Sequence, residues 1–217
     1  LAKAWLAEYT PQIKSLKDER KEAYRQIVEM STEPQDVDLV RPANKFEMTR
    51  VREGEKEADL PVWKHHLLCD ESGNYPALLN HWETKVFEIE TKREGFAFWY
   101  RNPQHTGQSS LGIAYVEAEQ YKIVRPDFLF FAEQDGKMVV DLVDPHSLHL
   151  ADALPKLEGL ALYAEHHSDA YRRIESVAEV KGKLRVLDLK RQDVQDAVAT
   201  AENAETLFSS GLADDYQ

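Results

Sequence analysis

The segment RPDFLFFAEQDGKMVVDLVDPH, residues 125–146, is the part of the sequence that most constrains the fold. Two strongly apolar runs, 127–133 and 138–143, flank Asp135-Gly136, and Asp-Gly between apolar runs is typical of a tight β-hairpin. A hairpin through this turn pairs residues whose numbers sum to about 271. The sequence therefore predicts two neighbouring antiparallel strands joined by a short turn.

The rest of the chain after residue 76 alternates between helical and extended patterns. The run FAFWY at 96–100 is continuously apolar, which is typical of a strand covered on both faces. Further strands are predicted at 111–116, 172–180 and 184–189, and helices at 76–92, 149–167 and 191–208. Pro155 should kink the second of these helices or delay its start. This order predicts an α/β fold with a mixed sheet and helices on its faces.

The first part of the chain has a different character. Residues 1–30 have the spacing of an amphipathic helix, and 31–62 form a proline- and charge-rich segment with one short strand near Phe46–Val51. We therefore divide the chain into a helical and irregular N-terminal extension, 1–75, and a domain at 76–217. The chain begins with Leu1 rather than methionine, so we expect it to be a processed or excised piece of a longer protein.

Composition limits the possible partners and compartments. The formal net charge of −12 argues against broad, nonspecific DNA binding by this chain alone, although a local basic groove remains compatible with it. The single cysteine, Cys69, allows neither an internal disulfide nor a thiolate zinc site, and a reducing cytoplasm is expected. No apolar run has the length of a membrane span. Cys69 near His65 and His66 is a weak candidate nucleophile, because no oxyanion-forming pattern surrounds it.

Two aspartates at the edges of the predicted hairpin are candidate metal ligands. Asp127 opens the first strand and Asp141 lies inside the second, where a buried carboxylate is unfavourable unless it is paired or metal-bound. Metal-dependent phosphodiester hydrolysis needs acidic oxygens that converge on Mg²⁺. The hairpin places Asp141 opposite about residue 130, roughly 10 Å from Asp127 by strand rise. A shared ion would therefore require a bulge or a strong twist.

The pieces NHWETK, FWYRNP, RPDFLFF and DGKMVVDLVDP carry a family resemblance. Residues 76–198 resemble the PD-(D/E)xK restriction-endonuclease-like fold. More closely, they are similar to the nuclease-type C-terminal region of type III restriction subunits and related DEAD/DEAH-box helicases. The resemblance implies a restriction-endonuclease-like mixed sheet flanked by helices.

The resemblance also implies a site. An acid on the first core helix, the Asp of PDF and an acid on the following strand correspond to Glu83, Asp127 and Asp141, which would bind Mg²⁺ or Mn²⁺. The lysine expected two residues after the third acid is replaced by Val143, which can neither orient a nucleophile nor offset charge. Lys156, on the following helix, and His146, just after the strand, are the candidate replacements.

Three functional hypotheses follow. The first is the C-terminal nuclease-like domain of a DNA helicase or of a restriction-type phage-defence protein, reaching DNA through the parent protein. The second is a catalytically degenerate domain that docks helicase motor domains in cis or a partner subunit. The third is a zinc-dependent hydrolase that uses His146 and His149. Under the second hypothesis, Asp141 would be held by a lysine, an arginine or a backbone donor rather than by a metal.

Overall fold

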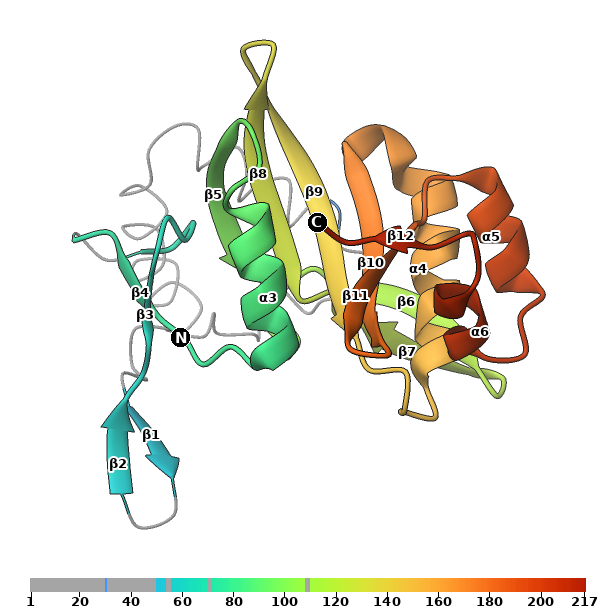
Figure 1. Cartoon of the computed structure of the whole chain (residues 1–217), viewed down its shortest axis with the longest axis horizontal. Helices are drawn as coiled ribbons and strands as arrows, with labels where there is room; N and C mark the ends of the chain where they lie inside the picture. The colour runs from blue at the N-terminus through green and yellow to red at the C-terminus, as the bar shows by residue number, and fades with distance from the viewer. Residues whose placement is uncertain (1–29, 31–49, 54–55, 70–71, 108–109) are drawn as a thin grey trace, which may run out of the picture.

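The computed structural model describes residues 30, 50–53, 56–69, 72–107 and 110–217. Its centre is a six-stranded sheet in the order β12-β11-β10-β9-β8-β5 (Figure 1). The strands are β5 (Phe96–Arg101), β8 (Phe128–Gln134), β9 (Lys137–His146), β10 (Arg173–Val180), β11 (Lys183–Asp188) and β12 (Asp214–Asp215). Strands β9 and β10 are parallel, whereas the other neighbouring pairs are antiparallel. The sheet is therefore mixed, as the sequence predicted.

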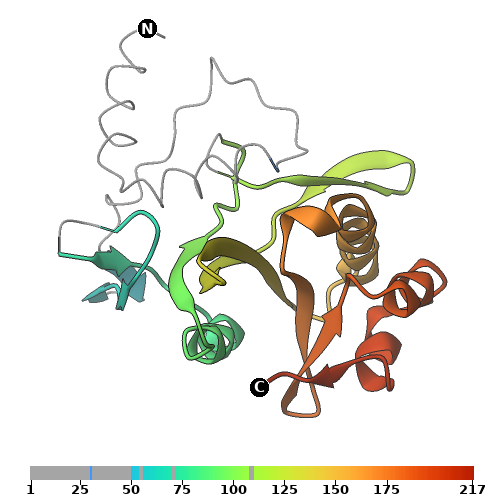
Figure 2. The ribbon, with the colours of Figure 1, turned by 90° about the horizontal axis from the view of Figure 1, so that it is seen from above.

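Helices cover both faces of this sheet (Figure 2). The helices are α3 (His81–Glu90), α4 (Ala153–His167), α5 (Gln192–Ala199) and α6 (Ala204–Ser209). Helix α3 packs on one face, and α4, α5 and α6 pack on the other, so the buried side chains form two separate clusters. The expected α/β class with helices on both faces is confirmed.

Several boundaries differ from the predicted ones for local reasons. Helix α3 begins at His81 rather than at 76, because Asn74–Pro76 forms a strand, β4, with β3 (Val62–Lys64). Helix α4 begins at Ala153, so Pro155 lies in the first turn and delays the start as expected. The helix predicted at 191–208 is two helices, because the side chain of Asn203 accepts a hydrogen bond from the Thr206 amide and starts α6.

Two further hairpins lie outside the central sheet. The strand predicted at 111–116 is β6 (Ile113–Glu117), and it pairs with β7 (Gln120–Val124), which the sequence analysis did not predict. Strands β1 (Arg50–Glu53) and β2 (Lys56–Asp59) form the other hairpin, and the strand predicted near Phe46–Val51 overlaps β1 at its last residues. The helix predicted at 1–30 lies outside the described residues except for Met30, which is helical.

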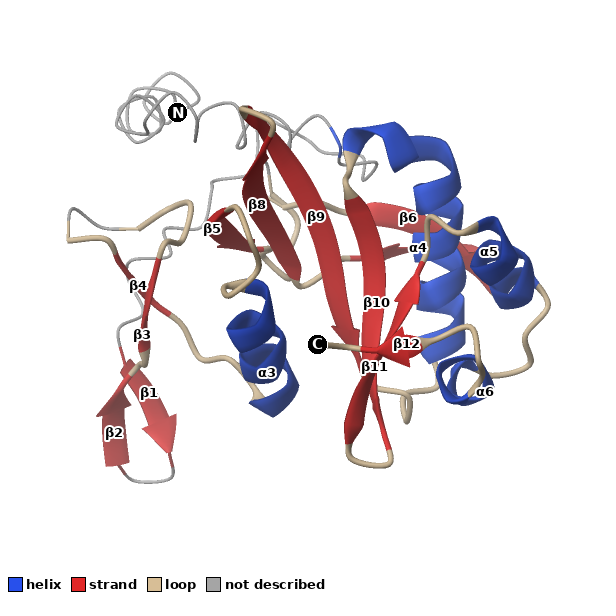
Figure 3. Cartoon of the chain, turned by 45° about the horizontal axis from the view of Figure 1, so that its top comes forward, coloured by secondary structure: helices blue, strands red, loops and turns tan. Residues whose placement is uncertain are grey.

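The β8–β9 hairpin lies between β5 and β10 in the central sheet and contributes side chains to both cores (Figure 3). Side chains alternate between the two faces of a strand, so Phe128 and Phe130 pack under α3 whereas Leu129 and Phe131 pack under α4. All four side chains are at most 2% exposed. The turn at Asp135-Gly136 has positive φ angles of 54° and 70°, as a tight hairpin of this kind requires.

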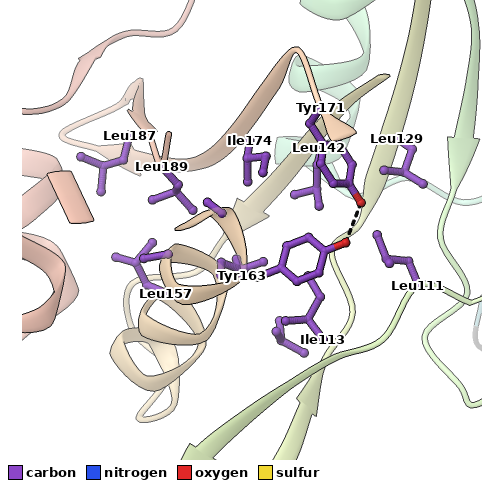
Figure 4. Packing of buried hydrophobic residues seen from close by; sticks show 14 of the residues in the cluster. Leu111, Ile113, Leu129, Leu142, Leu157, Tyr163, Tyr171, Ile174, Leu187 and Leu189 are labelled. Atoms are coloured by element: carbon purple, nitrogen blue, oxygen red, sulfur yellow. Dashed lines mark hydrogen bonds between the residues drawn. The ribbon is translucent and has the colours of Figure 1, made fainter. Parts of the chain in front are cut away.

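Helix α4 is held between the sheet and the β6–β7 hairpin. On its sheet side, Leu157 packs with Leu142 and Ile174, and the hydroxyls of Tyr163 and Tyr171 are hydrogen-bonded at 2.9 Å (Figure 4). On its hairpin side, a Cβ added at Gly159 would lie 2.5 Å from the Cβ of Tyr115. A glycine in this helix therefore permits the close approach of β6. None of the described helices combines the length and apolarity that a membrane span requires.

We expect Gly159→Ala to destabilise the protein. Alanine would ordinarily strengthen a helix by about 1 kcal/mol, but the overlap with Tyr115 should cost about 1–3 kcal/mol beyond that gain. Urea denaturation followed by circular dichroism measures the change. Gly211→Ala is the control, because no heavy atom lies within 4 Å of its added Cβ. Equal stability of the two variants would contradict the close approach of β6 and α4.

Candidate active site

The register of the β8–β9 hairpin decides which acid meets Asp127. Phe128 pairs with Val143, so the next step of the ladder places Asp144 opposite Asp127. The Asp127 amide donates a hydrogen bond of 3.0 Å to Oδ1 of Asp144. Both side chains lie at the end of the sheet where β8 begins and β9 ends. The structure thus brings Asp127 together with Asp144, three residues beyond the predicted partner.

Asp141 lies elsewhere, which corrects the predicted pair of Asp127 and Asp141. Asp141 pairs with Phe130, which packs under α3. Because side chains alternate along a strand and Asp141 is three residues from Asp144, Asp141 points to the α3 face and Asp144 to the opposite face. Its carboxylate accepts hydrogen bonds from both Arg172 and Arg173, with Arg172 Nε at 2.9 Å and Arg173 Nη2 at 2.7 Å. Burial opposes ionisation of Asp141, but the two arginines outweigh it, so its pKa lies below the usual value.

The arginines that hold Asp141 belong to a larger buried ion-pair cluster. Arg173 also binds Glu90 of α3 at 2.5 Å and Glu175 at 3.0 Å. The hydroxyl of Tyr216 donates a hydrogen bond of 2.6 Å to Glu90. The cluster therefore ties α3, β9, β10 and the C-terminal segment to one another, which is a structural role. This is the environment that the interaction-domain hypothesis expected for Asp141.

Glu83 lies in the first turn of α3 and is nearly buried. Its Oε2 accepts a hydrogen bond of 2.7 Å from the Asn80 amide, and the Asn80 side chain accepts one from the Glu83 amide, forming a capping box. Its Oε1 lies 2.6 Å from Nη2 of Arg101, at the end of β5. The same Nη2 lies 3.7 Å from Oδ1 of Asp127. Arg101 therefore links the predicted helix acid to Asp127.

Asp127 is in an unfavourable environment for a carboxylate. Burial, followed by repulsion from Asp144, raises its pKa to about 8, while Arg101 acts in the opposite direction. The amide of Gln104 donates a hydrogen bond of 3.0 Å to its Oδ1. A carboxyl group whose pKa is strongly raised beside a second acid is typical of functional sites.

The two candidate replacements for the missing lysine act on different members of this pair. Nδ1 of His146 is 3.5 Å from Oδ2 of Asp144, and the His146 side chain is 8% exposed. Lys156, in the first turns of α4, forms an ion pair of 2.7 Å with Asp152 and lowers the pKa of Asp127. His149 is exposed, whereas His146 is buried, and in the described part of the chain neither belongs to a group of three potential metal ligands.

The structure therefore gathers Glu83, Asp127, Asp144, His146 and Lys156 around the ends of β5, β8 and β9. In the described part of the chain, no group of three or more histidine, cysteine or acidic side chains forms a ready-made metal site. A divalent ion would be held chiefly by the oxygens of Asp127 and Asp144. Two carboxylates with water and substrate oxygens suffice for Mg²⁺, so these residues fit that ion.

One comparison with known proteins identifies a family. The model of the YagJ family matches residues 64–217, which is more than half of the chain. The chain belongs to the YagJ family. The region matched by the YagJ-family model contains every residue of the candidate site. No solved structure matches the chain.

The sequence analysis did not assign three residues, Arg101, Gln104 and Asp144, to the site of Asp127. Asp144 could have been found, because the expected sum of about 271 for paired residues assigns residue 144 to Asp127. No spacing in the sequence assigns Arg101 or Gln104 to Asp127. They reach Asp127 only because β5 and β8 are adjacent and the following loop turns back over the strand end.

We expect Asp141→Ala to destabilise the protein by about 1–3 kcal/mol, because it leaves the half-buried Arg172 and Arg173 without their shared counterion, although Arg173 keeps Glu90 and Glu175. Chemical denaturation measures the loss. Glu165→Ala, an exposed position on α4, is the matched control and should change stability by less than about 0.5 kcal/mol. Unchanged or improved stability of Asp141→Ala would instead support a metal-binding role for this residue.

Glu175 predicts a pH dependence of stability. Burial raises its pKa to about 7, with Arg173 opposing that rise. The carboxyl of Glu175 loses its proton near pH 4.5 in the unfolded chain and near pH 7 in the folded chain. The folded state therefore binds more protons in this window, and the free energy of unfolding should fall as the pH rises from about 4.5 to 7. We expect Glu175→Gln to remove part of this decrease, which denaturation at pH 5, 6, 7 and 8 measures. A pH profile that Glu175→Gln leaves unchanged would contradict the raised pKa.

Proposed function

We propose that this chain is a divalent-metal-dependent phosphodiesterase domain that acts on DNA and has a restriction-endonuclease-like fold. The observation that carries the proposal is the contact between Asp127 and Asp144 at the paired ends of β8 and β9. The hydrogen bond runs from the Asp127 amide to the Asp144 carboxylate, and the charge of Asp144 raises the pKa of the Asp127 carboxyl, so the two acids lie close together at a buried strand end. A metal site accounts for the pair more simply than stability does, because the repulsion between them is unfavourable.

The motif positions support this proposal better with Asp144 than with Asp141. The resemblance requires an acid on the first helix, an acid at the PDF position, an acid on the next strand and a lysine two positions later. The acid positions correspond to Glu83, Asp127 and Asp144, and His146 stands at the position of the lysine. With Asp144 as the third acid, the residue at the family's lysine position is His146 rather than Val143.

Each residue of the site would have a defined role. Asp127 and Asp144 would hold Mg²⁺ or Mn²⁺, which, when bound, polarises a phosphate oxygen and activates water. Lys156 supplies positive charge near Asp127, where charge on the phosphate increases during hydrolysis. Arg101 sits between Glu83 and Asp127 and can bind a phosphate oxygen through its guanidinium donors.

Binding of DNA by this domain would depend on other domains of the parent protein or on a partner subunit. The net charge of −12 supports little nonspecific affinity for a polyanion. We therefore propose that helicase motor domains in cis, or a partner subunit, deliver the DNA. The cationic groups Arg101 and Lys156 would then act locally on one phosphate rather than along a wide surface.

A second function is favoured by one specific contact. Nη2 of Arg101 already lies 2.6 Å from Glu83 and 3.7 Å from Asp127, so part of the negative charge is balanced without a metal. This arrangement supports a catalytically degenerate domain that docks a helicase or partner subunit. The two functions differ in whether a divalent ion can bind Asp127 and Asp144.

The variant Asp127→Asn distinguishes the nuclease from the docking domain. Without metal, we expect this variant to be more stable than the native chain by about 1–3 kcal/mol at pH 8, because it removes a buried carboxylate that repels Asp144. The gain should shrink toward pH 4, since the raised pKa of about 8 penalises only the ionised form. Adding Mn²⁺ should raise the melting temperature of the native chain and not that of Asp127→Asn or Asp144→Asn.

Activity is measured by cleavage of plasmid and branched DNA with Mn²⁺ or Mg²⁺. The native chain should cleave, and Asp127→Asn and Asp144→Asn should lose activity by about 100-fold or more. Asp169→Asn, at an exposed position, is the matched control and should cleave normally. No metal-dependent shift in melting temperature and no cleavage by the native chain would reject the nuclease and leave the docking domain.

A further inference from the structure

Two buried polar atoms lie beside Asp144 on neighbouring strands. In the described part of the chain, Nε2 of His146 and Oγ of Ser176 have no hydrogen-bond partner. Ser176 pairs with Asp144 across the parallel β9–β10 ladder, and Ala178 pairs with His146. Ser176 is 1% exposed and His146 is 8% exposed. Both atoms are therefore removed from bulk solvent.

The two side chains point to the same side of the sheet. Leu142 and Ile174 pair with each other and belong to the core under α4. Because side chains alternate along a strand, Asp144 and His146 share that face with Ser176. Nδ1 of His146 lies 3.5 Å from Oδ2 of Asp144, and Asp144 is the residue that pairs with Ser176. His146 and Ser176 therefore both adjoin Asp144 on this face.

A buried donor or acceptor without a partner is rare in native proteins, because water is lost and nothing replaces it. Direct bonding between the two groups would satisfy both, yet the structure shows none. A single water molecule satisfies both when it lies between them and is enclosed by polar groups. The pair therefore has the features of a water-binding position.

We propose that one buried water bridges Nε2 of His146 and Oγ of Ser176, which makes Ser176 a positioning residue of the candidate site. The role in catalysis rests on the proposed nuclease function, whereas the bridge itself does not. Nδ1 of His146 faces Oδ2 of Asp144 at 3.5 Å, so Nδ1 donates toward Asp144 and Nε2 accepts from the water. Ser176 thus holds the imidazole, and the imidazole fixes the orientation of Asp144.

This assignment separates the roles of the two candidate replacements for the lysine. Both ring nitrogens of His146 are directed at buried partners, so His146 supports Asp144 and does not face substrate. Lys156, which acts on Asp127, is then the cation at the substrate side. Ser176 itself is too deeply buried to serve as a nucleophile.

The bridge is tested first without reference to activity. A crystal structure of the metal-free chain that resolves water should show one water within roughly 2.7–3.2 Å of both Nε2 of His146 and Oγ of Ser176. Nitrogen-15 NMR of the imidazole should show the tautomer with the proton on Nδ1. The absence of this water, or a proton on Nε2 bonded to a protein group, would overturn the inference.

The positioning role is tested with Ser176→Ala in DNA cleavage. We expect kcat to fall at least fivefold while the affinities for Mn²⁺ and DNA change less than twofold. Ile174→Val is the control, because it trims a buried side chain on the same strand and face but removes no hydroxyl. It should leave kcat within twofold of the native value. Equal kcat values for both variants would overturn the role of Ser176.

The two tests separate this inference from the proposed function. If the native chain does not cleave DNA, the nuclease proposal fails, and the crystallographic water alone decides whether the bridge exists. If the native chain cleaves but Ser176→Ala cleaves equally well, the nuclease stands and the positioning role is rejected.

Discussion

The register of the β8–β9 hairpin is the constraint on which the rest of the structure depends. The tight turn at Asp135-Gly136 fixes Phe128 opposite Val143, and every other pair follows from it. A shift by one residue would move Phe128 and Phe130 from one buried face to the other, so both cores oppose it. The same register assigns Asp144 to Asp127 and sends Asp141 to the far face. The packing of the two cores therefore determines which acids lie together at the ends of β8 and β9.

The two faces treat buried acids in opposite ways. On the α3 side, Asp141, Glu90 and Glu175 are matched by arginines, and the cluster fastens four parts of the chain together. At the strand ends, Asp127 lies beside Asp144, and burial and the charge of Asp144 raise its pKa to about 8. Burial also raises the pKa of Glu175, but Glu175 has Arg173 at 3.0 Å, whereas the nearest arginine atom to Asp127, Nη2 of Arg101, lies at 3.7 Å and is already paired with Glu83. The incomplete pairing of Asp127, rather than the number of acids, distinguishes the candidate site from the structural cluster.

Much of the fold could be predicted from local patterns in the sequence. The apolar runs and the Asp-Gly turn were sufficient for β8, β9 and the antiparallel pairing, and the position of Pro155 indicated the late start of α4. Long-range partners were not accessible in this way. Arg172 and Arg173 meet Asp141 only through the parallel pairing of β9 and β10, and no spacing in the sequence encodes that pairing. A buried aspartate within an apolar strand therefore suggested a metal ligand, although distant arginines were its partners.

Arg101 is the residue on which the choice between nuclease and docking domain depends. It and Gln104 both approach Oδ1 of Asp127, while Asp144 receives the Asp127 amide on Oδ1 and faces His146 with Oδ2. A carboxylate oxygen has two lone pairs, so these contacts do not use up the acceptor capacity of either side chain. A guanidinium can also move from a carboxylate to a substrate phosphate with little change in hydrogen bonding. Arg101 therefore stabilises the acidic cluster without metal and remains able to contact a phosphate, so its ion pair with Glu83 alone does not make the site inactive.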